Sequence, residues 1–300
     1  MSDVAPLLEA AVRTAAPLLL AAVGESVNQR AGVMNIGLEG CIIAGAYAAF
    51  VFGGVAPLAG YSAAILAGAV VGLLLVTLSV WRQLDQVVVG TALTMLALGV
   101  TGTLFRAGGG VVTSIGATEP VLVIPLLSEL PFVGRALFAQ PLTTYVGIAI
   151  APAVWWWLHR THAGLALRAV GDSHDAAAAA GVRVGFTQAG AVLFGSAMGG
   201  LAGGTLVLAQ AGSFAEGMSA GRGFIAIAVV ALGRWRMGGV MVASLVFGVA
   251  MALQYVVQAQ GWRVRYELVL MIPYILTLAA LGAFGRGTAP AMLGRRRGGV

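Results

Sequence analysis

The chain has 300 residues but no lysine, a single cysteine and few charges of either sign. Without lysine it cannot hold the GxxxxGK[ST] phosphate-binding loop, which excludes ATP hydrolysis by that chemistry. The lone Cys41 excludes an intrachain disulfide and a CxxC metal site. Only 9% of residues are charged and 59% are hydrophobic, with a mean hydropathy of +0.95. Because an ordinary soluble domain lies far from these values, the composition predicts an integral membrane protein.

Apolar runs recur along the chain, and most of them have the length that a helix needs to cross a ~30 Å hydrocarbon core. Continuous Leu, Val and Ile mixed with small residues gives no period of two, so helices are expected and a barrel is not. Since no linker divides the chain, residues 1–300 are expected to form one all-α transmembrane bundle of about eight to ten helices. The first run has few basic residues before it and is not expected to be a cleaved signal peptide. The expected runs are 14–27, 36–52, 57–81, 87–105, 142–158, 187–210, 224–233, 240–257 and 268–284.

All 17 basic residues are arginine, and their positions predict the orientation. Short cytoplasmic loops collect positive charge, so segments rich in arginine are expected in the cytoplasm and the irregular, glycine- and proline-containing loop 106–140 outside. Arg263 and Arg265 fit this scheme poorly. The arginines are scattered among loops rather than gathered on one face, so no nucleic acid is expected as a partner. The cytoplasmic set is Arg82, Arg160, Arg168, Arg183, Arg234, Arg236, Arg286, Arg295, Arg296 and Arg297.

Residues 24–47 place several polar side chains inside apolar sequence, which is costly at bilayer depth and typical of function. The functional interpretation is a translocation path along a broken or re-entrant helix, and glycines at 32, 37 and 40 favour such a break. The structural alternative is that Arg30 pairs with Glu25 or Glu39 while asparagines cap the break. The path residues expected here are Asn28, Gln29, Asn35 and Glu39.

The loop 159–186 contains an alanine-rich stretch that predicts a short helix over 173–180. Ser173 or Asp172 can cap its start, and Gly181 can end it. A short helix across the mouth of a bundle can dock a cytoplasmic partner. A solvated connector is the alternative.

Residues 213–228 carry Gly217-Met218-Ser219-Ala220-Gly221, which formally matches the GxSxG nucleophile motif. That motif needs a preceding strand and a nearby base, and His159, His162 and His174 all lie in the other loop, so an intramembrane hydrolase is a weak alternative. A tight turn is favoured, with Ser213 and Glu216 along the substrate path and Glu216 near a pore mouth or in a salt bridge with Arg222.

Gly195, Gly199 and Gly203 recur at every fourth position and fall on one helix face. Small residues in this pattern allow a second helix to approach closely. We therefore expect them to serve helix packing.

The segments GESVNQRAGVMNIGLEG, LRAVGDSHDAAAAAGV and GMSAGRGFIAIAVVALGRW, in this order, resemble the permease subunits of bacterial ABC importers for nucleosides and simple sugars. The wider group includes branched-chain amino-acid permeases, and the resemblance spans most of the chain. It implies that the alanine-rich helix is the coupling helix that sits on the ATP-binding subunit, and that Asn28, Asn35 and Glu39 line the path. One departure is Met237, where such permeases often have proline, which puts the shape of that turn in doubt. The coupling residues implied are Arg168, Gly171, Asp175, Ala179 and Gly181.

The same resemblance implies three partners: a cytoplasmic ATPase subunit that holds ATP and Mg, a second permease chain, identical or paralogous, and an extracytoplasmic substrate-binding protein. It also implies a multi-pass location in the bacterial inner membrane, among membrane lipid. No catalytic residue, metal or cofactor is expected in this chain. We expect nucleoside import by alternating access. The alternatives are simple sugars such as ribose, branched-chain amino acids, or an ion-gradient carrier that uses Arg30 and Glu39.

Overall fold

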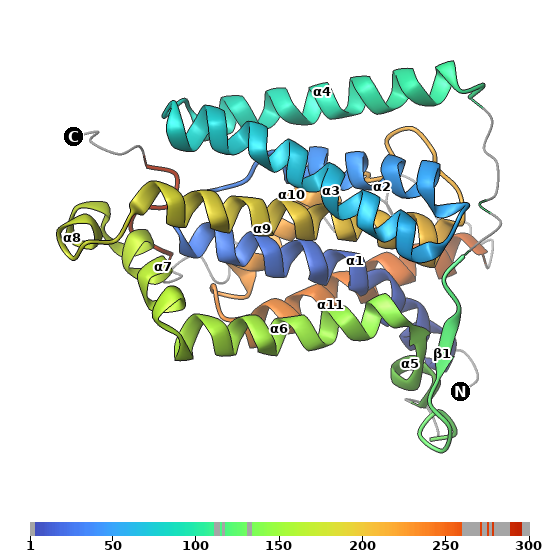
Figure 1. Cartoon of the computed structure of the whole chain (residues 1–300). Helices are drawn as coiled ribbons and strands as arrows, with labels where there is room; N and C mark the ends of the chain where they lie inside the picture. Colours follow the sequence, from blue (N-terminus) through green and yellow to red (C-terminus); the bar gives the residue numbers. More distant parts are fainter. Residues whose placement is uncertain are drawn as a thin grey trace.

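The computed structural model describes residues 4–110, 115, 118–130, 134–259, 271, 275, 278 and 289–295, and these are mostly helical (Figure 1). Every expected run up to residue 257 coincides with a described helix. The expected run 268–284 falls almost wholly outside the described residues, as do Arg263, Arg265, Arg286, Arg296 and Arg297.

Six helices are long, and two of them continue into a π-helical turn. The long helices are α1 (Val4–Arg30), α3 (Pro57–Leu75), α4 (Gln86–Ala107), α6 (Leu142–Arg160), α9 (Val184–Thr205) and α11 (Met237–Ala259). The π-helical turns are η1 (Val76–Trp81) after α3 and η2 (Leu206–Ala211) after α9. The shorter helices are α2 (Leu38–Gly53), α5 (Gly134–Phe138), α7 (His162–Asp172), α8 (His174–Ala179) and α10 (Arg222–Leu232).

Within the described residues, five helices are long and apolar enough to cross a membrane: Ala5–Arg30, Pro57–Trp81, Gln86–Ala107, Val184–Ala211 and Met237–Gln254. α6 has 19 residues but is not among them, because its tryptophans, threonines and terminal histidine lower its hydropathy. The chain is a multi-pass membrane protein.

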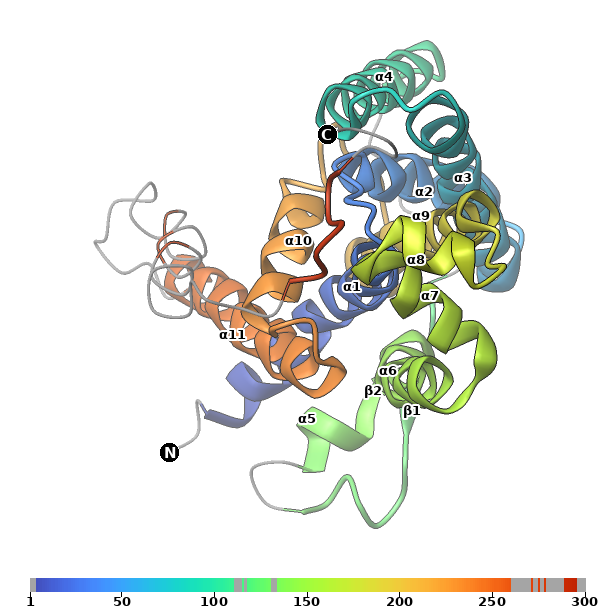
Figure 2. The same cartoon turned by 90° about the vertical axis from the view of Figure 1, so that its left-hand side faces the viewer.

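α1 and α9 form the centre of the bundle (Figure 2). α9 contacts α1, α2 and α3, and α1 also contacts α6, α10 and α11. α4 lies at one edge, beside α2 and α3. The helix pair α7 and α8 projects from one end of the bundle, whereas α5 and the two short strands lie at the other end (Figure 1). The two ends are called here the α8 end and the sheet end.

Glycines allow α9 to sit at the centre, because its neighbours approach its backbone on two sides. A Cβ atom on Gly203 would overlap the backbone of Ile42 in α2, and one on Gly200 would overlap the backbone of Ala64 in α3. Gly199 lies against Leu38 and Cys41 of α2. These close contacts are the geometry that small-residue faces permit between membrane helices.

Pro17 lies inside α1 and leaves the carbonyl of Arg13 without its helical partner, because proline has no N–H. The amide nitrogen of Gln210 donates to this carbonyl at 2.6 Å. The hydrogen bond therefore joins the middle of α1 to the π-helical turn that ends α9.

Side-chain caps fix where several helices begin. Asp85 accepts from the backbone N–H groups of Val87 and Val88 at the start of α4, and Thr161 accepts from that of Gly164 in α7. α7 was not anticipated, since the expectation for 159–186 was a polar loop around a single short helix.

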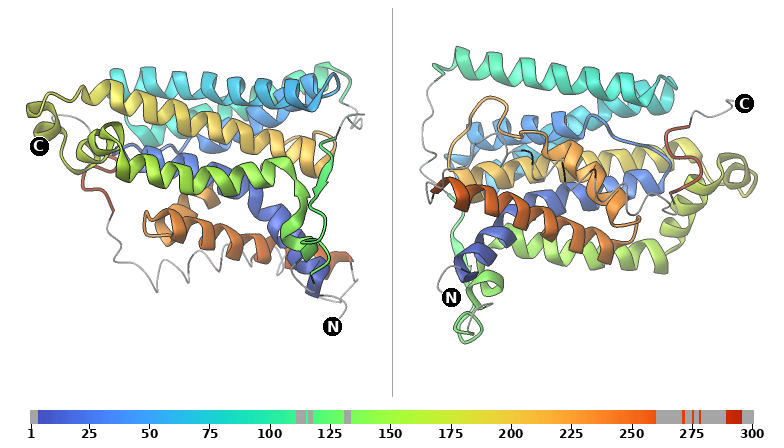
Figure 3. Two further views of the ribbon diagram at one scale, coloured as in Figure 1. Left: turned by 60° about the horizontal axis from the view of Figure 1, so that its bottom comes forward. Right: turned by 180° about the vertical axis from the view of Figure 1, so that it is seen from behind.

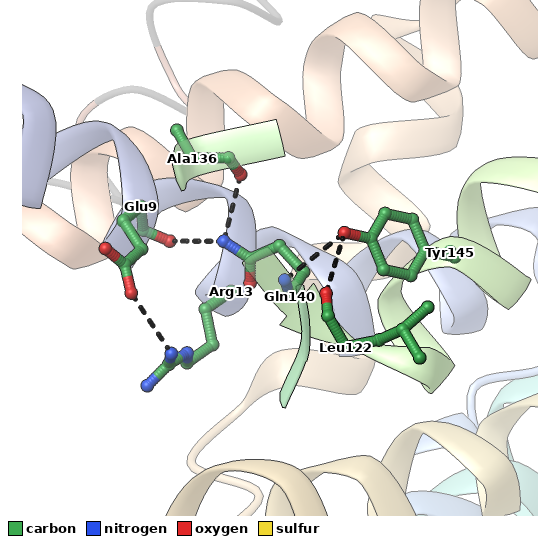
Figure 4. A network of polar contacts seen from close by, with 6 residues as sticks. All are labelled: Glu9, Arg13, Leu122, Ala136, Gln140 and Tyr145. Carbon is green, nitrogen blue, oxygen red and sulfur yellow. Dashed lines mark hydrogen bonds and ion pairs between the residues drawn. The ribbon is translucent and has the colours of Figure 1, made fainter. Parts of the chain in front are cut away.

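The segment 106–140, expected to be irregular, contains α5 and two strands that pair antiparallel, β1 (Val121–Val123) and β2 (Ala139–Pro141). Gln140 ties this sheet to α1: its side-chain amide donates to the carbonyls of Glu9, at 3.4 Å, and Ala136, at 2.9 Å (Figure 4). The Tyr145 hydroxyl accepts from the backbone N–H of Gln140 and donates to the carbonyl of Leu122. This sheet is thus tied to the start of α1 and to α6 at one end of the bundle.

Glu119 fastens the same loop to three helical segments. It accepts from the Tyr61 hydroxyl of α3 and from the backbone and hydroxyl of Thr143 in α6, while its own N–H donates to Leu208 of η2. A half-buried carboxyl group with several donors holds the loop in one position.

Gly203→Ala is predicted to destabilise the protein although alanine usually stabilises a helix by about 1 kcal/mol relative to glycine. Overlap with the Ile42 backbone forces α2 away from α9, at a cost of about 1–3 kcal/mol or more. The matched control is Gly99→Ala in α4, where nothing lies within 4 Å of the new methyl group. Thermal unfolding in detergent should give a lower Tm for Gly203→Ala only; equal values for the two variants would contradict this packing.

Candidate functional site

Glu25 is the centre of a polar network at the α8 end of α1, and its side chain is completely buried. Its carboxyl oxygens accept from the Asn28 amide at 2.8 Å, the Gln29 amide at 2.9 Å and the Asn35 backbone N–H at 3.2 Å. The first two donors lie one turn further along α1, whereas Asn35 lies in the non-helical segment 31–37. Glu25 therefore holds the chain in its path after α1 ends.

Asn28 and Asn35 each keep one side-chain oxygen without a hydrogen-bond partner among the described residues, although both residues are fully buried. The Asn35 amide nitrogen donates to the Ser196 hydroxyl of α9 at 3.0 Å, and Asn28 packs against Gly195 of α9. Buried polar atoms without partners are uncommon and often mark function. These two oxygens can accept hydrogen bonds from water or from a ligand.

Gln29 connects the network to the turn between α10 and α11. Its side-chain oxygen accepts from the Trp235 indole N–H at 2.7 Å. In the same turn Arg234 and Trp235 both have a φ of 54°, a left-handed conformation that is strained for bulky residues. Met237 then begins α11, at the first helical position, where proline is also accepted.

Arg30 pairs with neither Glu25 nor Glu39 in the described part of the chain, so the structural alternative weighed from sequence is wrong on this point. Its guanidinium donates to the Trp235 carbonyl at 2.7 and 3.2 Å. Arg30 thus holds the backbone of the strained turn, and Gln29 holds the Trp235 side chain within it.

Glu39 joins two short helices at their starts. It lies in the first turn of α2, and its carboxyl group accepts from the N–H groups of Gly221, at 2.8 Å, and Gly223, at 2.6 Å, at the start of α10. Carboxyl groups are favourable near helix N-termini because unpaired N–H groups and the helix dipole attract them. Glu39 is thus engaged in holding α2 to α10.

Ser213 and Glu216 lie away from this network. Ser213 lines a cavity of about 720 Å³ together with Glu9, Arg13, Gln210 and Arg222. Gln210 is 15 residues beyond Gly195, which places the cavity about 20 Å along α9 from Asn28. Glu216 lies 3.7 Å from the guanidinium of Arg106 and forms a salt bridge with this arginine of α4.

Ser219, the centre of the GxSxG match, is buried, and the element directly before it is the π-helical turn η2, whereas the motif needs a strand there. It lies in a turn where Gly217, Ala220 and Gly221 have positive φ values. His159, His162 and His174 lie in α6, α7 and α8, at the other end of the bundle. The turn therefore shapes the start of α10 and lacks the arrangement of a nucleophile elbow.

α8 begins after Ser173, whose hydroxyl accepts from the N–H of Ala176, and Gly181 follows it with a φ of 83°. One face of α8 buries His174 and Ala177. The other face is exposed and bears Asp175, Ala176, Ala178 and Ala179. α8 therefore presents small side chains and one carboxyl group to the surroundings at the end of the bundle.

The buried face of α8 contacts the segment that follows α1. The Gln188 amide of α9 donates to the Ala31 carbonyl at 3.1 Å, and its nitrogen lies 3.1 Å from the His174 imidazole. In α7, a Cβ on Gly171 would overlap the Arg30 carbonyl. A displacement of α8 would therefore be transmitted, through Gln188, to the end of α1 beside the Glu25 network.

The C-terminal segment 289–295 also holds α7 to the segment that follows α1 (Figure 3). The N–H of Met292 donates to the Gly171 carbonyl at 2.9 Å, and that of Gly294 donates to the Gly32 carbonyl at 3.2 Å. This segment therefore bridges α7 and the turn after α1.

The structure brings together three of the expected path residues, Asn28, Gln29 and Asn35. It places Glu39 where α2 and α10 begin. Among the expected coupling residues, Gly171 faces α1, Asp175 and Ala179 are exposed on α8, Gly181 follows it, and Arg168 lies half-buried in α7. Sequence reasoning overlooked Trp235, Ser196, His174 and Gln188 as members of the site. The GRW element was a signal for Trp235, but nothing local identified the other three.

Comparison with known proteins gives a consistent answer. The family model described as branched-chain amino acid transport system / permease component matches residues 7–281. A guanosine ABC transporter permease of Bacillus subtilis is 35% identical over 290 residues, 92% of this chain and 91% of that protein. A nucleoside ABC transporter permease of Lactococcus lactis is 32% identical over 296 residues, 91% of this chain and 90% of that protein.

A protein of Haloferax volcanii, provisionally named a glucose ABC transporter permease, is 36% identical over 260 residues, 85% of this chain and 78% of that protein. The chain therefore belongs to the family of branched-chain amino acid transport permease components and is an ABC-transporter permease with nucleoside permeases among its relatives.

Proposed function

We propose that this chain is the membrane-spanning subunit of an ATP-driven importer that moves nucleosides across the bacterial cytoplasmic membrane by alternating access. The observation that carries the proposal is the link, through Gln188 of α9, between His174 of α8 and the Ala31 carbonyl at the end of α1, next to the buried polar network. The partners proposed are an ATPase subunit that binds ATP and Mg, a second permease chain, and an extracytoplasmic substrate-binding protein.

Broken helices support a path through the bundle. At 1.5 Å per residue, α2 is about 24 Å long and α10 about 17 Å, both shorter than a ~30 Å hydrocarbon core. We infer that each is one half of a discontinuous span, entered through 31–37 and 212–221. On this interpretation eight of the described helices lie in the membrane, α1, α2, α3, α4, α6, α9, α10 and α11, within the expected eight to ten. Discontinuous helices in transporters place backbone groups and polar side chains beside the substrate.

The unpaired oxygens of Asn28 and Asn35 support a substrate with hydrogen-bond donors. In the present closed arrangement they are buried. When the bundle opens they can accept from ribose hydroxyls or nucleobase N–H groups. The cavity lined by Ser213, Gln210 and Arg222 is the proposed mouth of the path on the outer side, and Glu216 lies beside it.

Two relatives are named for nucleosides or guanosine, which supports a nucleoside as the substrate here. The relative from Haloferax volcanii is named for glucose, so a simple sugar is the second candidate. Both ligand classes carry several hydroxyl groups, and the two asparagine oxygens suit either. Branched-chain amino acids, which the family description names, present an apolar side chain, which suits this polar network less well.

The lack of lysine means that this chain cannot carry the phosphate-binding loop, so a separate subunit must supply ATP hydrolysis. We propose that this ATPase binds the exposed face of α8, including Asp175 and Ala179. The relatives are transport permeases, and we infer that this chain likewise catalyses no covalent step. An ion-gradient carrier built on Arg30 and Glu39 is disfavoured, because both are held by backbone partners.

Asp175→Arg is predicted to reduce nucleoside uptake at least tenfold in cells that express this chain with its neighbouring transporter genes, without loss of the protein from the membrane. The exposed side chain contributes little to folding, whereas a reversed charge at a docking surface weakens binding by more than about 1.4 kcal/mol. Uptake of labelled guanosine and glucose, and co-purification of the ATPase subunit, are the measurements.

Glu129→Arg, an exposed charge reversal at the sheet end, is the matched control and should leave co-purification of the ATPase unchanged. If uptake is unchanged in Asp175→Arg and a protonophore abolishes that uptake, the carrier interpretation moves to first place.

Gln188→Leu is predicted to uncouple transport from ATP hydrolysis. The variant loses the hydrogen bond to the Ala31 carbonyl but keeps the exposed face of α8, so the complex should assemble and hydrolyse ATP. Nucleoside transported per ATP should fall about tenfold, the equivalent of about 1.4 kcal/mol of lost coupling. Thr187→Val is the control, since that hydroxyl bonds only the carbonyl of Arg183 one turn earlier. Equal transport per ATP in the two variants would refute the role of Gln188.

A further inference from the structure

A groove of about 700 Å³ lies between α6, α7 and α9, outside the polar network described above. One residue of α1, Val27, also reaches it. Its lining is almost wholly apolar, and none of the described residues that form it is acidic. Its lining combines small residues with aromatic ones: Ala153, Ala163, Ala166, Gly190 and Ala191 with Trp157, Phe186 and Phe194.

The groove runs along the membrane helices for about the depth of one leaflet. Its lining on α9 extends from Phe186 to Phe194, which is about 12 Å at 1.5 Å per residue. Half of a ~30 Å hydrocarbon core is about 15 Å. Phe186 is 69% exposed and Phe194 37%, so the rim is open to the surroundings of the bundle.

Two arginines lie near the end of the groove next to α7 but do not line it, and Arg183 lines a neighbouring pocket with His174 and Asp175 of α8. Arg160 follows Trp157 by three residues at the end of α6, and Arg183 precedes Phe186 by three residues at the start of α9. Both arginines are exposed. Trp155 and Trp156, also exposed, lie in the turn of α6 before Arg160, as aromatic residues do at membrane interfaces.

We propose that this groove is a binding site for an anionic phospholipid, with one acyl chain along α9 and the headgroup between Arg160 and Arg183. The apolar trough matches the chain in chemistry and depth, and the arginines match the charge of a phosphate at the cytoplasmic surface. A lipid held here contacts Ala163, Ala166 and Leu167 of α7. It therefore braces the α7 and α8 pair against the bundle.

The charge pattern favours a lipid over a protein segment. A second permease chain would require the exposed arginines to meet acidic partners, whereas the anionic surface of the membrane already lies at that height. The groove depends on neither the substrate nor the ATPase, so the inference stands apart from the proposed function.

Gly190→Leu tests the groove, because Gly190 lines it and nothing lies within 4 Å of a Cβ added there. The matched control is Gly99→Leu in α4, which is equally open and outside the groove. The purified full chain is tested in detergent with added dioleoyl phosphatidylglycerol or dioleoyl phosphatidylcholine. Bound lipid is counted by native mass spectrometry, and Tm is measured for each sample.

We expect wild type and Gly99→Leu to retain phosphatidylglycerol and to gain several degrees in Tm from it, with a smaller gain from phosphatidylcholine. Gly190→Leu should lose at least one retained lipid and most of the Tm gain. Arg160→Gln combined with Arg183→Gln leaves the trough intact and should remove the preference for phosphatidylglycerol.

Equal retention in Gly190→Leu and Gly99→Leu, or equal affinity of wild type for the two lipids, would overturn the proposal. Loss of a permease dimer in Gly190→Leu, seen by gel filtration, with no change in bound lipid, would assign the groove to a second permease chain and overturn it as well.

Discussion

The buried carboxyl group of Glu25 is the constraint on which this structure depends. A polar group of this kind at membrane depth must find partners within the protein, and Glu25 finds them in Asn28, Gln29 and the backbone of Asn35. The last of these bonds sets the course of the chain between α1 and α2. The position of Asn35 then fixes its contact with Ser196 of α9. One side chain therefore organises the junction of three helices.

A second carboxyl group, Glu39, completes this arrangement by holding the starts of α2 and α10 together. Short helices whose first N–H groups are buried need acceptors, and Glu39 supplies two oxygens to α10 while lying in the first turn of α2. Gln29 and Arg30 hold the turn that follows α10 through their hydrogen bonds with Trp235. Polar side chains thus connect α1 and α2 to α10 and to the turn that follows it. In a lipid environment, apolar contacts between helices provide little specificity for such connections.

Sequence periodicity and composition predicted the helices well, since a membrane demands long apolar runs and these have sharp ends. The Ser173 cap and the Gly181 stop likewise predicted α8 from local chemistry. α7 was overlooked because its polar and apolar residues alternate along an interface rather than forming an apolar run. The strands near Leu122 and Gln140 were overlooked because they are three residues each and pair across a loop.

The site could be predicted in part. The density of polar residues between Glu25 and Glu39 located it, but roles within it depend on contacts over long sequence separations. Glu39 was expected along the path, which stays a prediction, but its cap on α10, 184 residues away, was not foreseen. Arg30 was weighed as an ion-pair partner and instead binds a carbonyl in a strained turn that no pattern reveals. Gln188 and His174 meet Ala31 only through the packing of α8 on the bundle.

The central claim is that ATP hydrolysis on a partner drives nucleoside movement through this chain. Its most direct test is uptake into proteoliposomes that contain the purified permease, ATPase and binding-protein assembly, with labelled guanosine outside the vesicle and ATP accessible to the ATPase. The account predicts guanosine accumulation that requires ATP hydrolysis, competes with other nucleosides and is insensitive to collapse of the ion gradient. Accumulation of guanosine without ATP, or ATP-dependent uptake of glucose but not of guanosine, would contradict it.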